Sequence, residues 1–117
     1  MVLENLTPHA VAIEGYGTVP PSGIVARVRE SVVCVESLEG IPILRVGYAG
    51  VEGLPDALLP HEWEQGTAVP RMYIVSAMVL QACAREDLVA PYTGPDPRYA
   101  PIREGGRVMA VRALVAR

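Results

Sequence analysis

Glycine and proline limit the fold of this chain more than any other feature. The 117 residues include 11 glycines and 11 prolines, spread along the whole length rather than gathered in one linker. Both residues interrupt helices and central strands, so the segments between them are short. Several of these segments are rich in valine and isoleucine, which favour strands. The sequence therefore predicts a strand-rich single domain that covers residues 1–117.

Composition excludes several classes of protein. Half of the residues are hydrophobic and 20% are charged, which indicates a globular chain with a core rather than a disordered one. No uninterrupted apolar run approaches the ~18 residues that span a bilayer, so we expect no membrane partner. The first residues contain no basic segment followed by a hydrophobic stretch, and we therefore expect a cytoplasmic protein.

Charge narrows the possible partners. The net charge of −3 argues against a nucleic-acid polymer as the partner. All ten cationic side chains are arginine. The absence of lysine excludes Schiff-base chemistry and a P-loop, whereas the planar arginine fork keeps recognition of carboxylates and phosphates possible.

The first half of the chain predicts antiparallel strands. Residues 10–13 read as a strand that ends at a glycine turn, and residues 24–29, 31–36 and 41–46 read as a meander with its bend at residues 39–40. Between residues 47 and 70 the repeated glycines and prolines predict a long irregular crossover.

The second half supplies the predicted helix. Residues 73–75 form a buried strand candidate, and Ser76 stands where an N-cap would precede a run of good helix formers that ends near Arg85. A last strand is expected over residues 107–115. The predicted fold class is therefore α+β: a strand-rich antiparallel sheet with one main helix, about residues 76–86, packed on it.

Candidate catalytic groups lack the neighbours that their chemistry needs. Residues 61–65 begin like a zinc-peptidase motif, but position 65 is glutamine instead of the second histidine. Ser76 with His9 and Asp87 could form a triad, but bulky residues flank the serine and an N-cap explains it better. We predict no catalytic residue, no metal site and no cofactor.

The two cysteines are far apart in sequence. Cys34 and Cys83 both stand in apolar surroundings, which suits buried free thiols better than a disulfide.

Ligand recognition is the chemistry that the remaining residues support. The loop at residues 92–99 offers two aromatic rings, an arginine, a hydroxyl and a carboxylate, which together suit a base, a ribose and a phosphate. A proline-stiffened surface loop or an oligomer contact is the alternative, and Asn and Thr near the N-terminus commonly satisfy their own turns. The predicted ligand-binding residues are Asn5, Thr7, His9, Ser76, Arg85, Tyr92, Thr93, Arg98 and Tyr99.

The order of short motifs resembles a known family. Asn-Leu-Thr-Pro-His at residues 5–9, Val-Glu-Gly-Leu-Pro at 51–55 and Tyr-Ile-Val-Ser at 73–76 occur in this order, followed by a Gly-Arg turn at 106–107. The chain resembles a family of small uncharacterised proteins encoded by bacteriophages and prophages. This resemblance implies an accessory protein made in a host cytoplasm, and it transfers no catalytic residue.

These observations lead to one main functional hypothesis and two alternatives. We predict a non-enzymatic protein that sequesters a small anionic ligand, such as a nucleotide-derived defence signal. A homo-oligomer is expected because so short a chain encloses little volume, and subunit junctions create deeper pockets. The alternatives are an interaction module that inhibits a host enzyme through the region around Trp63, and a small hydrolase that uses Ser76 or His9.

Overall fold

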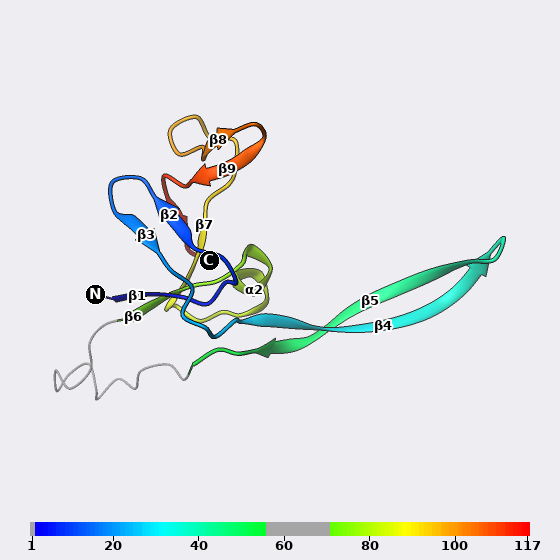
Figure 1. Cartoon of the computed structure of the whole chain (residues 1–117). Helices are drawn as coiled ribbons and strands as arrows, with labels where there is room; N and C mark the ends of the chain where they lie inside the picture. The colour runs from blue at the N-terminus through cyan, green and yellow to red at the C-terminus, as the bar shows by residue number, and fades with distance from the viewer. Residues whose placement is uncertain (1, 56–70) are drawn as a thin grey trace.

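The computed structural model describes residues 2–55 and 71–117. Within these residues the chain is dominated by strands (Figure 1). The elements are β1 (Val2–Asn5), β2 (Val11–Ile13), β3 (Gly17–Val19), β4 (Arg27–Leu38), β5 (Ile41–Glu52), β6 (Arg71–Ile74), α2 (Ala77–Ala82), β7 (Leu88–Pro91), β8 (Ile102–Glu104), β9 (Arg107–Ala110) and β10 (Leu114–Val115).

A four-stranded sheet forms the centre of the molecule. Its order is β1-β6-β7-β10; β1, β6 and β7 run parallel, and β10 pairs antiparallel with β7. The apolar runs at residues 73–75 and 88–90 are buried, as expected for parallel strands covered on both faces. The burial predicted for residues 73–75 is confirmed, while β1 and the parallel pairing were not predicted.

Two hydrophobic clusters cover the two faces of this sheet. Alternate residues of β6 and β7 point to opposite sides. On one side Tyr73 and Leu88 join Val79 and Leu80 of α2, together with Val28 and Val51 at the base of the β4–β5 hairpin. On the other side Ile74 and Val89 join Val19, with residues of β1, β2 and β10 packed around them. The core is therefore a thin sheet between the helix and a small hairpin.

The predicted main helix over residues 76–86 is wrong, and with it the α+β class. Helix α2 has six residues, and Cys83 already adopts an extended backbone with φ −134° and ψ 125°. The helix links two parallel strands of four residues each, so it needs only about 9 Å of length to return the chain to the start of β7. Favourable helix propensity over residues 83–86 does not outweigh this geometry.

A long two-stranded arm is the largest departure from the predicted meander. β4 and β5 pair antiparallel over twelve residues each, and the hairpin extends far from the rest of the chain (Figure 1). The bend at residues 39–40 is confirmed, with Glu39 and Gly40 at φ 50° and 80°, as a type I′ turn requires. The predicted irregular crossover is wrong for residues 47–52, which continue β5; residues 56–70 lie outside the described residues.

The arm makes the molecule elongated. Its radius of gyration is 17.6 Å, against about 13 Å for a compact domain of this length. The chain exposes 8079 Å², about 1,900 Å² more than the roughly 6,200 Å² typical of a compact monomer of this mass.

At the base of the arm Gly53 has φ 81°, and a Cβ there would collide with the carbonyl of Val25. This close approach anchors the arm to the core.

The C-terminal part folds as a hairpin followed by a short strand. The predicted single strand over residues 107–115 is divided: β9 pairs with β8, Val111 bridges to Ile13, and β10 returns to the central sheet. Both cysteines are free thiols, as predicted, but neither is fully buried: Cys34 is exposed on the arm, and Cys83 is partly buried against the core. Within the described residues, we find no helix with the length and apolar character needed to cross a membrane.

Candidate functional site

Asn5 holds the N-terminal turn together. Its buried amide donates to the carbonyls of His9 (2.8 Å) and Val19 (3.1 Å), and its oxygen accepts from the backbone N–H (2.9 Å) and hydroxyl (2.6 Å) of Thr7. These four bonds tie the loop after β1 to β3. The hydrogen-bonding capacity of Asn5 is thus used inside the fold, whereas the side chain of His9 is exposed.

Ser76 and Arg85 also have structural partners. The hydroxyl of Ser76 accepts from the N–H of Val79 and caps α2. Arg85 forms a bidentate pair with Asp87, donates to the carbonyl of Pro55, and lies 5.9 Å from the ring centre of Tyr73. Hydrogen bonding to Asp87 raises the pKa of Arg85. Arg85 therefore fixes the return from α2 to β7.

The loop at residues 92–99 is stabilised by its own side chains. The hydroxyl of Tyr92 accepts from the N–H of Asp96, and the carboxylate of Asp96 pairs with Arg98 at 3.0 Å. The hydrogen bonds from Arg98 lower the pKa of Asp96, and Asp96 in turn raises the pKa of Arg98. Arg98 also lies 5.3 Å from the ring centre of Tyr99. Tyr92, Arg98 and Tyr99, which the sequence predicted as ligand-binding residues, thus lie together in this loop, and Asp96 offsets the charge of Arg98.

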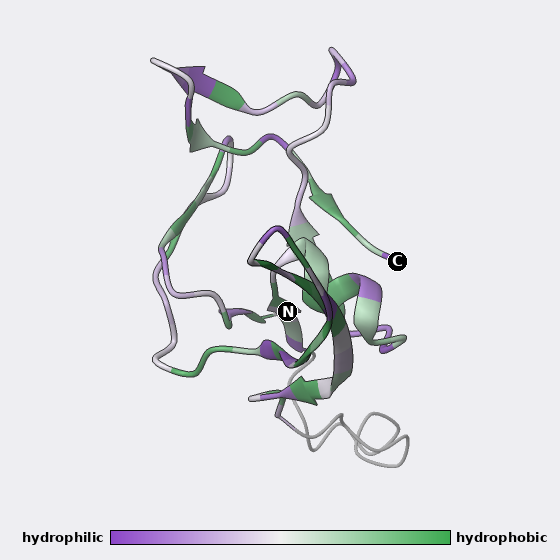
Figure 2. Ribbon diagram, turned by 90° about the vertical axis from the view of Figure 1, so that its right-hand side faces the viewer, coloured by the Kyte–Doolittle hydropathy of each residue, from purple (hydrophilic) through white to green (hydrophobic). Residues whose placement is uncertain are grey.

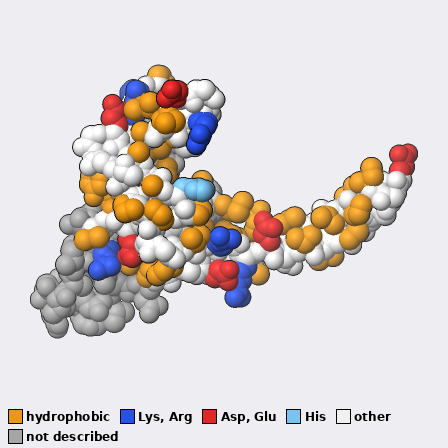
Figure 3. Space-filling view, viewed as in Figure 1, with side chains coloured by type: hydrophobic (Ala, Val, Ile, Leu, Met, Phe, Trp, Pro, Cys, Tyr) orange, Lys and Arg blue, Asp and Glu red, His pale blue; other side chains and the backbone are white. Residues whose placement is uncertain are grey.

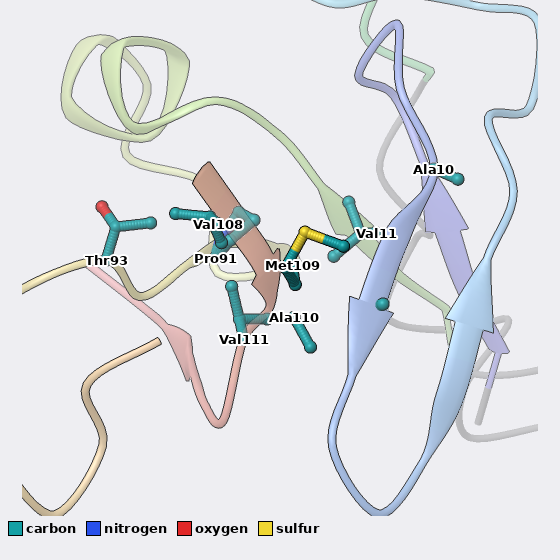
Figure 4. A pocket seen from close by; sticks show the side chains of 9 residues that line it. Ala10, Val11, Pro91, Thr93, Val108, Met109, Ala110 and Val111 are labelled. Atoms are coloured by element: carbon teal, nitrogen blue, oxygen red, sulfur yellow. The ribbon is translucent and has the colours of Figure 1, made fainter. Parts of the chain in front are cut away.

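A shallow apolar hollow lies between the N-terminal and C-terminal hairpins. It has a volume of about 150 Å³ and is lined by residues of β2, β9 and the chain after β7. Figure 4 shows Met109 reaching from β9 toward Val11, with Thr93 at the opposite side. Small-molecule sites typically have about 300–1,000 Å³, so this hollow is small for a nucleotide and suits one or two apolar side chains.

The arm carries an apolar stripe that begins at the core. The register places Val28 and Val51 on the same face of the hairpin as three further pairs: Glu30 with Tyr48, Val32 with Val46, and Cys34 with Leu44. The first pair packs against the core, while Val32, Val46, Leu44 and Tyr48 are between 46% and 57% exposed. We call the residues Val32, Cys34, Leu44, Val46 and Tyr48 the arm stripe. Figure 3 shows hydrophobic side chains along the arm from its base to its far end.

The opposite face of the arm is polar near its base. Arg27, Arg29 and Arg45 lie on this face, and Arg29 pairs with Glu52 at 3.0 Å. An irregularity in the pairing between Cys34 and Glu36 then changes which residues share a face. Beyond it, Leu38 and Ile41 pair next to the turn on the face opposite the arm stripe, and they are 54% and 61% exposed. We call Leu38 and Ile41 the arm tip.

A two-stranded ribbon of this length with both faces exposed is unusual in a single chain. An isolated hairpin is marginal in water, and long exposed apolar strands with open edges promote association. The view along the arm shows hydrophobic segments on both of its strands (Figure 2). The sequence indicated strands here through its valine content, but the length of the hairpin, and hence its exposure, was not predicted.

Potential metal-ligating side chains are dispersed in the part of the chain that the structure describes. In residues 2–55 and 71–117 no three histidine, cysteine, aspartate or glutamate side chains gather as a metal site would require. The predicted functional region around His61 and Trp63 lies outside the described residues. Comparison with protein-family models, with curated proteins and with solved structures finds no match to this chain.

Proposed function

We propose that this protein is a non-enzymatic binding protein that works as a homo-oligomer, in which the arm stripe of each copy packs against another copy. The observation that carries the proposal is the continuity of the arm stripe with the hydrophobic core through Val28 and Val51. A partner that packs on this face therefore extends the existing hydrophobic core, and does not form a contact that is isolated from the core. Burial of the half-exposed valines and Tyr48 supplies the driving force.

The size of the exposed surface supports a second copy as the partner. The excess of about 1,900 Å² per chain over a compact monomer would amount to roughly 3,800 Å² for a pair of copies. Obligate homo-oligomers bury about 2,000–5,000 Å², whereas transient contacts bury less than about 1,200 Å². The excess exposed surface of the chain is thus of the size of an obligate interface, and the half-exposed side chains of the arm stripe are part of it.

The mass of the purified chain in solution tests this proposal. Sedimentation velocity at micromolar concentration is expected to give a multiple of 12.5 kDa, and dilution is expected to lower it only far below micromolar. A mass of 12.5 kDa at all concentrations up to the millimolar range would contradict the proposal and would favour a different protein as the partner of the arm.

Sequestration of a small anionic ligand is the second candidate. It is supported by the guanidinium of Arg98, which lies over the ring of Tyr99 on an exposed loop and offers a flat surface for a base. Because Asp96 offsets the charge of Arg98, such a ligand would need further cationic groups from a second copy. Titration calorimetry with cyclic dinucleotides, on the wild type and on Arg98→Ala, separates this candidate from assembly alone.

A further inference from the structure

The arm tip is a second apolar patch, separate from the arm stripe. Leu38 and Ile41 flank the turn at the far end of the hairpin, on the face opposite the arm stripe. Contact between another copy and the arm stripe therefore leaves the arm tip uncovered. Glu36 and Glu39 stand beside it, and Figure 3 shows an acidic group at the extreme end of the arm.

The hollow between β2 and β9 has the complementary chemistry. Its walls are mainly aliphatic, and Val108 and Met109 at its edge are 40% and 51% exposed. The volume of about 150 Å³ matches one or two aliphatic side chains. The hollow thus offers apolar contact surface of the size that a branched aliphatic pair would fill.

Two arginines lie on the hairpin of β8 and β9, whose second strand lines the hollow. Arg103 is paired in register with Val108, and Arg107 precedes Val108 on β9. Arg103 donates to the carbonyl of Gly106, and neither arginine takes part in an ion pair among residues 2–55 and 71–117, although Glu104 is opposite Arg107 across the hairpin. The acidic groups at the arm tip and the arginines of the β8–β9 hairpin are therefore of opposite charge, and both surfaces offer apolar side chains.

We propose that the arm tip of one copy inserts Leu38 and Ile41 into the hollow of a second copy, with Glu36 and Glu39 facing Arg103 and Arg107. This proposal rests on the homo-oligomer proposed above and adds the place where the arm ends. Within one chain the arm extends away from the body that carries the hollow, so a second copy must supply the arm tip (Figure 1). The contact joins two different surfaces, and such heterologous contacts build rings or reciprocal exchanges of arms.

Cross-linking between two differently labelled chains tests the insertion. Both chains carry Cys34→Ser and Cys83→Ala, and their mass is first shown to equal that of the wild type. One chain then receives Ile41→Cys and the other Met109→Cys, and the mixture is oxidised. A disulfide requires Cα atoms within about 7 Å, so we expect a product that joins one chain of each label only if the tip reaches the hollow. Met78→Cys, a similarly exposed site on α2, replaces Met109→Cys as the control and is expected to give no such product.

The outcomes separate the two proposals. A covalent dimer with Met109→Cys and none with Met78→Cys supports the insertion. Chains that associate by mass but form no disulfide between the introduced thiols, or that cross-link equally at both sites, overturn the insertion and leave the homo-oligomer standing. Chains that stay at 12.5 kDa overturn both.

Discussion

Replacement of Val32 by aspartate is expected to convert the oligomer into monomers at concentrations where the wild type is fully assembled. Val32 lies in the middle of the arm stripe, opposite Val46, and is 53% exposed in a single chain. Assembly would bury the introduced carboxylate on the face that already carries Glu30 two residues away, so the variant adds a second negative charge to the apolar interface. An unpaired buried charge costs several kcal/mol, and a loss of about 3 kcal/mol already weakens association more than a hundredfold. Sedimentation velocity measures the change.

Val33 provides a matched control for this variant. It is the same residue type on the same strand, is 57% exposed, and lies on the opposite face of the hairpin, paired with Arg45. Val33→Asp is therefore expected to keep the mass of the wild type, since the new carboxylate has an arginine across the strand. Circular dichroism of both variants checks that the central sheet is intact. Equal dissociation of the two variants, or of neither, would show that the arm stripe is not the interface.

Replacement of Asn5 by alanine is expected to destabilise the fold by about 3 kcal/mol, because it removes the four hydrogen bonds by which the buried Asn5 side chain holds Thr7, His9 and Val19. For a domain of this size the melting temperature should fall by about 12 °C. Thermal unfolding at one fixed protein concentration measures the change, because oligomer stability depends on concentration.

Thr7→Ala is the control for Asn5→Ala. It removes the hydroxyl that links Asn5 to the carbonyl of His9, together with a half-buried methyl group, and leaves the Asn5 amide in place, so a loss of about 1 kcal/mol is expected. If Asn5→Ala leaves the melting temperature unchanged and weakens binding of an added nucleotide, Asn5 contacts a ligand, and its assignment to the turn would have to be abandoned.

The predicted strands that proved correct depend on local sequence. Residues 10–13 and 73–75 are apolar, include β-branched valine and isoleucine, and are bounded by turn residues. Strands β2 (Val11–Ile13) and β6 (Arg71–Ile74) cover most of these two predicted segments. The bend at Glu39 and Gly40 is local as well, because glycine tolerates the positive φ of a tight turn.

The errors arise where distant contacts decide the structure. Helix α2 is short because two four-residue strands set the span of the crossover, which the helix propensity of residues 83–86 does not reveal. Gly47 and Gly50 read as the end of a strand, yet both lie inside β5, and Gly50 has φ 108° near the irregular pairing at Val28 and Glu30. Glycine in a strand marks a bulge as often as a break.

In the candidate site, too, the features that depend on local sequence were predicted and those that depend on distant contacts were not. The turn made by Asn5 and Thr7 and the pair of Asp96 with Arg98 are short-range, and their residue types were recognised in the sequence. Their partners within the fold became visible only in the structure, as did the apolar stripe of the arm. That stripe depends on which residue of β5 faces each residue of β4. The sequence of either strand alone does not determine this pairing register.

Hydrogen exchange along the arm of the unmodified protein tests the central claim most directly. A hairpin in contact with water on both faces opens readily, whereas one packed into an oligomer opens only with the assembly. We expect the amides of residues 30–48 to exchange as slowly as those of β6 and β7 at a concentration where the chain is assembled, and to lose this protection on dilution into monomers. Rapid exchange of the arm in the assembled protein, with β6 and β7 still protected, would contradict the claim that another copy covers it.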